Sequence, residues 1–94
     1  MSSQKISIEY SSRFISERKK FLKNNPRRLD DYDKITNLFI SNPLHPSLNL
    51  EKLQNAKGVW TTRLNRRDRI FFIWKGKNAV IFIAIGKHDK YRKY

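Results

Sequence analysis

Residues 58–85 read GVWTTRLNRRDRIFFIWKGKNAVIFIAI, and this stretch decides the fold. It contains three runs rich in β-branched and aromatic residues, at 59–64, 69–74 and 79–85. Two short polar segments, NRRD and KGKN, separate the runs and are typical of tight turns. Such short connections join antiparallel neighbours. The stretch therefore predicts a three-stranded antiparallel meander.

The first half of the chain predicts one strand followed by two helices. Residues 5–10 alternate polar and apolar side chains, as a half-buried strand does. Apolar residues then recur at helical spacing through Lys23. Asn25 and Pro26 mark a second helix start, because asparagine caps the free N–H groups and proline in the first turn loses no needed donor. Pro43 follows the end of that helix.

Residues 43–58 show little periodicity, and we interpret them as a connection to the meander. The expected order is an N-terminal strand, an αα-hairpin and the meander. This order predicts an α+β fold with the helices packed on one face of a small sheet. A length of 94 residues is suited to one domain, which we assign to residues 1–94.

Charge is the main feature of the composition. Lys and Arg number 21 against 8 Asp and Glu, which gives a net charge of +13 and favours a polyanionic partner such as nucleic acid or an acidic protein. With no cysteine and two histidines, a standard zinc site is excluded, and we expect no metal or cofactor. No segment approaches the roughly 20 apolar residues of a membrane span, and the N-terminus lacks a signal-peptide core. We expect a cytoplasmic protein without membrane contact.

Two arginines are the first candidates for function. Period-two alternation turns Trp60 and Phe72 toward the helices, so Arg63 and Arg69 lie on the opposite face. They flank a short turn, which would make them neighbours. Paired guanidiniums are suited to a phosphate, because each offers two parallel donors. The alternative is that both are ordinary solvated arginines.

Three further side chains have chemistry that an active site can use. His88 exchanges a proton near neutral pH, and Tyr91 can donate a proton or stack on a base. Both could instead belong to a solvated tail. Glu51 is an isolated acid among basic residues, and the alternative for it is a helix-start or salt-bridge role. No glycine-rich phosphate loop, HExxH motif or nucleophile elbow is present.

Taken in order, these parts resemble the RelE/ParE superfamily of toxins from bacterial toxin–antitoxin systems. The resemblance covers nearly the whole chain and is carried by GVWTTRL at 58–64, RIFF at 69–72, a second hydrophobic strand and a terminal His-x-x-Tyr. The Trp-x-x-Arg…Arg spacing is most similar to the YoeB branch, whose members are ribosome-dependent mRNA endonucleases. The resemblance implies a RelE-like fold.

The resemblance also implies roles for individual residues. Arg63 corresponds to a phosphate-binding arginine, Arg69 to the arginine that stabilises the charged phosphate, and Glu51 to the general base. Basic residues close to these positions become candidates for RNA contact: Arg66, Arg67, Lys87 and Lys90.

The general acid stays open at this point. His88 and Tyr91 occupy the terminal region where family members keep a His or Arg and a Tyr. YoeB-like chains tend to place the two side by side, whereas Asp89 and Lys90 separate them here. His88, Tyr91 and Asp89 are therefore all candidates for the acid.

The implied function is that of a type II toxin, an endoribonuclease that cleaves mRNA on the ribosome by metal-independent 2′-OH attack and so inhibits translation. The implied partners are the ribosome, mRNA and a cognate acidic antitoxin. Phe71 and Ile73, on the Arg69 face, are candidates for apolar surface that the antitoxin covers. Two alternatives are a DNA gyrase inhibitor of the ParE branch and a non-catalytic basic RNA-binding module.

Overall fold

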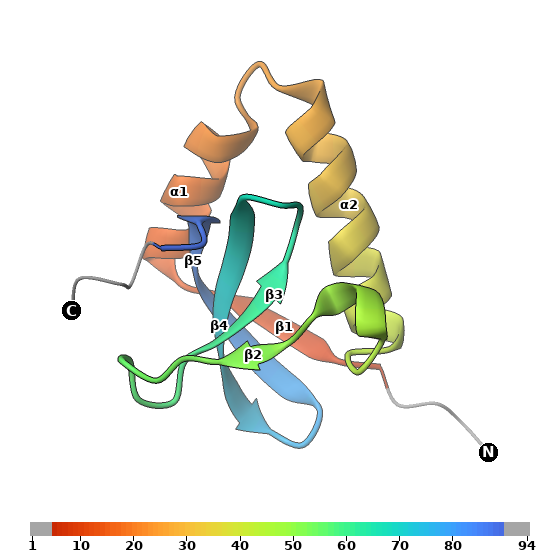
Figure 1. The fold of residues 1–94 in the computed structure, drawn as a ribbon, viewed down its shortest axis with the longest axis vertical. Helices are drawn as coiled ribbons and strands as arrows, with labels where there is room; N and C mark the ends of the chain where they lie inside the picture. The colour runs from red at the N-terminus through yellow and green to blue at the C-terminus, as the bar shows by residue number, and fades with distance from the viewer. Residues whose placement is uncertain (1–4, 90–94) are drawn as a thin grey trace.

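The computed structural model describes residues 5–89 and shows an α+β fold with a helical layer on a sheet (Figure 1). The strands are β1 (Ser7–Tyr10), β2 (Glu51–Lys52), β3 (Trp60–Arg63), β4 (Asp68–Gly76) and β5 (Ala79–Lys87). The helices are α1 (Ser12–Leu22), α2 (Pro26–Ser41) and the short 3-10 helix η1 (Pro46–Leu48). The predicted fold class, with a strand, a helical hairpin and a meander in this order, is confirmed.

The sheet has five strands in the order β1-β5-β4-β3-β2. β3, β4 and β5 form the predicted antiparallel meander, and β1 pairs in parallel with β5. β2 lies within residues 43–58, for which the sequence predicts only a connection. Its two residues, Glu51 and Lys52, pair with Thr61 and Trp60 of β3. A strand of two residues is too short to leave an alternating pattern in the sequence.

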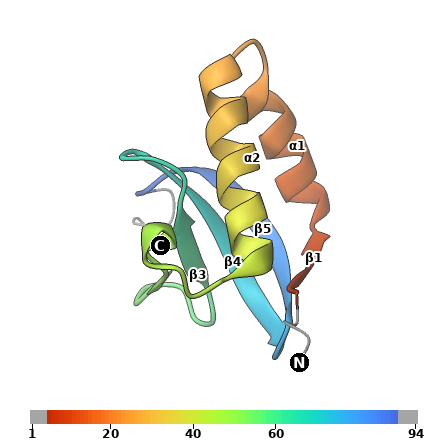
Figure 2. The same ribbon diagram turned by 90° about the vertical axis from the view of Figure 1, so that its right-hand side faces the viewer.

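Each of the two α-helices begins at a side-chain cap, of which Asn25 is the one that the sequence analysis predicts. The Ser11 side chain accepts a hydrogen bond from the Phe14 N–H at 3.0 Å, and Asn25 Oδ1 accepts one from the Arg28 N–H at 3.1 Å. Both helices then run over one face of the sheet, as Figure 2 shows. No helix within residues 5–89 is long and apolar enough to cross a membrane.

The main core lies between the helices and the sheet and is rich in phenylalanine. Phe14, Phe39, Phe72 and Phe82 are fully buried in it. The centres of the Phe39 and Phe72 rings lie 5.1 Å apart, and those of the Phe14 and Phe82 rings lie 5.3 Å apart. Both pairs pack edge to face. Because Phe72 faces this core, alternation along β4 directs Arg69 to the opposite face.

The opposite face of the sheet is partly covered by the loop between β2 and β3. Phe71 and Ala84 are fully buried there and form a small second core with Val59. The expectation that Phe71 is exposed to a partner is therefore wrong, because this loop folds back over it. Ile73 is 36% exposed, and its predicted role in binding a partner stays a prediction.

Candidate active site

Two arginines lie side by side at one end of the sheet face that the helices leave open. Arg63, the last residue of β3, is the register partner of Arg69 in β4. Directly opposed residues of antiparallel strands project from the same face, so the two side chains leave the sheet together. Arg63 is exposed and Arg69 is partly buried. The structure thus brings the two arginines together, while their roles stay predictions.

Arg69 is anchored over the turn that connects β3 to β4. Its Nη1 donates hydrogen bonds to the backbone oxygens of Asn65 at 2.9 Å and Asp68 at 3.0 Å. Burial, and then the neighbouring charge of Arg63, lower the pKa of Arg69 from its ordinary value, and the carboxylates of Glu51 and Asp68 oppose this shift. A guanidinium stays protonated in proteins, so the shift reflects the cost of partly burying one cation beside another.

Glu51 lies in the same row of side chains. It is the register partner of Thr61, which precedes Arg63 by two residues, and this spacing places both positions on one face. Glu51 is exposed, and its charge acts on Arg69. β2, the strand that the sequence did not indicate, is thus the element that carries Glu51 toward the arginines.

His88 follows the end of β5 at the same end of the sheet. Gly86 of β5 is the register partner of Arg69, and the His88 N–H donates to the Arg67 oxygen at 2.8 Å. This bond continues the pairing of β4 with β5 past Lys87. It holds the exposed His88 beside the turn that carries the arginines.

Two predicted residues, Lys90 and Tyr91, lie outside the described residues. Asp89, the third candidate for the general acid, is exposed directly after His88. The choice of acid among His88, Tyr91 and Asp89 is therefore unchanged.

Four adjacent strands together supply a set of side chains suited to proton transfer around an anion. Glu51 can accept a proton, Arg63 and Arg69 can bind a phosphate, and His88 can donate a proton. Within residues 5–89, no group of three or more His, Asp and Glu side chains could hold a metal ion. The arrangement brings groups capable of proton transfer close to two cations, of which Arg69 is held by hydrogen bonds and Arg63 is exposed.

Solved structures match this fold, although no family model and no curated protein matches the chain in sequence. A YoeB/ParE toxin from Agrobacterium tumefaciens matches with a TM-score of 0.73 at 13% identity, over 88% of this chain and 99% of that chain. The chain has the fold of the YoeB/ParE toxins. The DinJ–YafQ complex from E. coli matches with a TM-score of 0.71 at 21% identity, over 88% of this chain and 93% of that chain. The YoeB–YefM complex from Staphylococcus aureus matches with a TM-score of 0.69 at 21% identity, over 88% of this chain and 97% of that chain. The resemblance seen in the sequence is confirmed in the fold.

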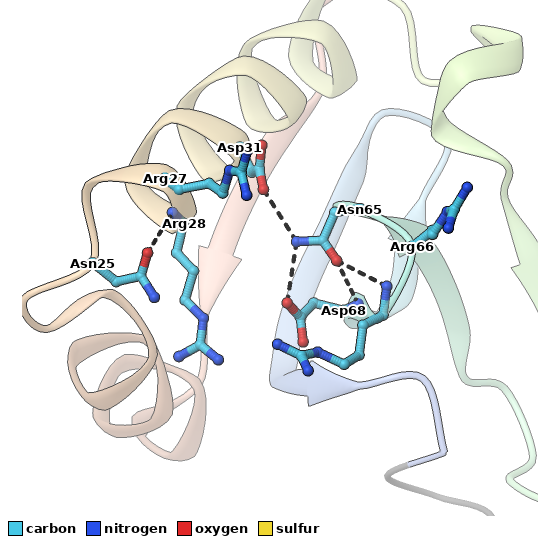
Figure 3. A pocket seen from close by; sticks show the side chains of 8 residues that line it. Asn25, Arg27, Arg28, Asp31, Asn65, Arg66 and Asp68 are labelled. Atoms are coloured by element: carbon cyan, nitrogen blue, oxygen red, sulfur yellow. Dashed lines mark hydrogen bonds between the residues drawn. The ribbon is translucent and has the colours of Figure 1, made fainter.

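In this YoeB/ParE fold, a polar network that the sequence analysis missed lies on the helix side of the same turn (Figure 3). Asn65 Nδ2 donates to Asp31 of α2 and to Asp68, at 3.1 Å each, and Asn65 Oδ1 accepts the N–H groups of Arg67 and Asp68 at 2.9 Å. The bonds to the turn are typical of an asparagine in its first position. The bond to Asp31 joins residues 34 apart and has no local sequence signal. It fixes the turn to α2.

Proposed function

We propose that this protein is the toxin of a type II toxin–antitoxin system and acts as an endoribonuclease. The observation that carries the proposal is the row of Glu51, Arg63 and Arg69 on one sheet face, with His88 at its end. The fold match to YoeB/ParE and YafQ toxins supports the class of protein. The side chains themselves support the reaction.

In the proposed reaction, a ribose 2′-OH of the RNA attacks the adjacent phosphorus. Glu51 accepts the hydroxyl proton while the new P–O bond forms. The bond from phosphorus to the 5′-oxygen breaks, and the general acid, with His88, Tyr91 and Asp89 as candidates, protonates that oxygen. The products are a 2′,3′-cyclic phosphate and a 5′-hydroxyl. Arg63 and Arg69 stabilise the additional negative charge on the phosphorane, an effect that commonly contributes on the order of 10²–10³ in rate per donor.

We further infer that the mRNA is cleaved on the ribosome and that an acidic antitoxin inhibits the protein. The net charge of +13 is suited both to ribosomal RNA and to an acidic protein. Two structural neighbours are complexes, of YafQ with DinJ and of YoeB with YefM, which supports a cognate protein partner for this chain. A target on the ribosome would place the protein in the cytoplasm.

The test is cell-free translation of a reporter mRNA, with the new RNA ends mapped by primer extension. The wild-type protein should create ends within the translated region only when ribosomes are translating. Arg69→Ala should lower the cleavage rate by about 10²-fold or more. Because Arg69 also anchors the turn, Arg63→Ala provides a second variant, since the exposed Arg63 side chain has no hydrogen bond to the described residues. Lys77→Ala, at the other end of β4, is the control and should cleave normally.

Three results would contradict the proposal. Accumulation of broken DNA without ribosome-dependent RNA ends would support the gyrase alternative. Full cleavage by a folded Arg63→Ala and Arg69→Ala double variant, with circular dichroism unchanged, would remove the arginines from the mechanism. RNA binding without any cleavage would support the non-catalytic binding module.

A further inference from the structure

A pocket of about 520 Å³ lies between the N-terminal part of α2 and the β3–β4 turn (Figure 3). Asp68 lines the pocket, and Arg69, the next residue of β4, faces the opposite side of the sheet. The pocket is therefore on the helix side of the turn, while the candidate active site is on the other side. Eight residues line it: Asn25, Arg27, Arg28, Asp31, Asn65, Arg66, Arg67 and Asp68.

Positive charge dominates the pocket. Four of its residues are arginines, two from the first turn of α2 and two from the β3–β4 turn: Arg27, Arg28, Arg66 and Arg67. The pocket also contains two aspartates, yet no ion pair joins any of these arginines to an acidic side chain within residues 5–89. Among the described residues, the guanidiniums thus have no ion-pair partner even though two carboxylates line the same pocket.

Asn65 holds both carboxylates of the pocket, which keep their negative charge, so four arginines and two aspartates leave a net formal charge of +2. Its amide donates to Asp31 and to Asp68, so both carboxylates are already hydrogen-bonded to a neutral group. Asp68 is also only 3% exposed and lies at the base of the turn. Arg28 is held in place separately, because its Nη1 donates to the Phe21 oxygen at 3.0 Å and its guanidinium lies 4.4 Å from the centre of the Phe21 ring.

We propose that this pocket binds a backbone phosphate of RNA, as a second contact site across the turn from the candidate active site. Arginine guanidiniums match phosphate oxygens in pairs, and the N-terminus of α2 adds a partial positive charge at the same place. Arg66 and Arg67 belong to the turn between β3 and β4, two to three residues before Arg69 of β4. An RNA strand held at Arg63 and Arg69 would therefore reach the pocket by crossing one turn.

This inference rests on the proposed function in taking RNA as the ligand. An acidic protein segment is the competing class of ligand for a basic pocket. Continuity with the paired arginines favours RNA, because a polynucleotide presents phosphates at regular spacing along a strand that spans both sites. The two classes are separated by the experiment.

The test measures RNA binding apart from cleavage. The full-length protein is titrated into a short fluorescein-labelled single-stranded RNA whose riboses are 2′-O-methylated, which blocks the attacking hydroxyl. Fluorescence anisotropy is recorded over a range of salt concentrations. An Arg27→Gln and Arg66→Gln double variant is compared with a Lys5→Gln and Lys77→Gln double variant. Both control lysines are exposed, and both lie near the β4–β5 turn at the far end of the sheet.

The pocket variant should bind at least about fivefold more weakly at moderate salt. The slope of log affinity against log salt should become shallower by about one, because the contact with one phosphate is lost. The loss of affinity in the Lys5→Gln and Lys77→Gln control variant should be less than half of the loss in the pocket variant. Thermal unfolding checks that both variants are folded. Equal losses in the two double variants would overturn the proposal.

Asp31→Asn provides a test of opposite sign. The variant keeps an oxygen that accepts the Asn65 amide proton and removes one negative charge, so RNA should bind more tightly. Weaker binding would overturn the proposal. If polyglutamate binds through the arginines of the pocket while RNA binding is unaffected by them, the ligand is an acidic protein segment and the RNA assignment is wrong. The binding assay uses RNA that cannot be cleaved, so it tests the pocket independently of catalysis. If the pocket bound this RNA but the protein gave no ribosome-dependent cleavage, only the proposed function would be contradicted.

Discussion

At the residue scale, consecutive side chains of β4 occupy three different environments. Asp68 is buried in the lining of the basic pocket and accepts the Asn65 amide, Arg69 faces the candidate active site, and Ile70 is fully buried in the main core. A register shift of one residue would exchange these environments, because successive side chains face opposite sides of a strand. The turn before Asp68 is held by the hydrogen bonds of Asn65, and it fixes this register. It therefore determines which side chains of β4 face each candidate site.

Tyr32 should set an alkaline limit on stability. Its phenol accepts a hydrogen bond from Arg18 at 3.0 Å, and burial raises its pKa above the ordinary 10.0, an effect that Arg18 partly opposes. Because the folded pKa is the higher one, this contribution is complete below about pH 10 and is lost as the pH rises through the folded pKa. Urea unfolding from about pH 9 to about pH 11 should show a smaller loss of stability for Tyr32→Phe than for the wild type.

The control for this measurement is Tyr10→Phe, since the Tyr10 side chain is 41% exposed. Its alkaline loss of stability should equal that of the wild type. An identical alkaline loss in wild type and Tyr32→Phe would show that burial of this phenol does not control the transition.

At the element scale, α2 has two functions in the fold. One face contributes Tyr32, Ile35 and Phe39 to the main core. Its N-terminal turn forms one wall of the basic pocket, and Asp31 connects it to the β3–β4 turn. Packing of the apolar face therefore positions the charged end of the helix against the turn.

Asn25→Ala should weaken this arrangement at the helix start. The substitution removes the side-chain acceptor for the Arg28 N–H, which should lower the free energy of unfolding by about 1 kcal/mol in urea titrations. Asn37→Ala, at an exposed position in the same helix, should leave stability equal or slightly higher, because alanine is the better helix former. If both variants unfolded at the same urea concentration, the cap would have no energetic role.

At the scale of the whole molecule, charge density is the dominant feature. A net charge of +13 is contained in a fold with a radius of gyration of 12.8 Å. Screening acts over about 8 Å at physiological ionic strength, so basic groups on neighbouring elements repel one another at low salt. Binding of a polyanion would relieve this repulsion.

The thermal midpoint of unfolding should therefore rise with salt concentration. Sodium chloride and potassium glutamate compared at equal ionic strength should raise it similarly if screening is the cause. The measurement is a thermal scan followed by circular dichroism. A midpoint that is flat or falls between low and moderate salt would mean that self-repulsion is not a significant part of the energetics.

The amino-acid sequence by itself determined the order of elements and the juxtaposition of Arg63 and Arg69. Helix caps, period-two alternation and short turns are local signals, and the short connection at residues 64–67 brings the two strands, and with them Arg63 and Arg69, together. The same local reasoning placed Phe71 on the correct face of the sheet. It could not reveal that a loop covers that face.

Only the tertiary structure decided which distant residues join the two sites. β2 brings Glu51 alongside β3, the β2–β3 loop buries Phe71, and Asn65 reaches across to Asp31. These contacts depend on how separate elements pack. The residues near each contact in the sequence do not by themselves favour it over other local conformations. The physical reason is that local patterns select elements, whereas long-range burial and hydrogen bonding select their relative placement.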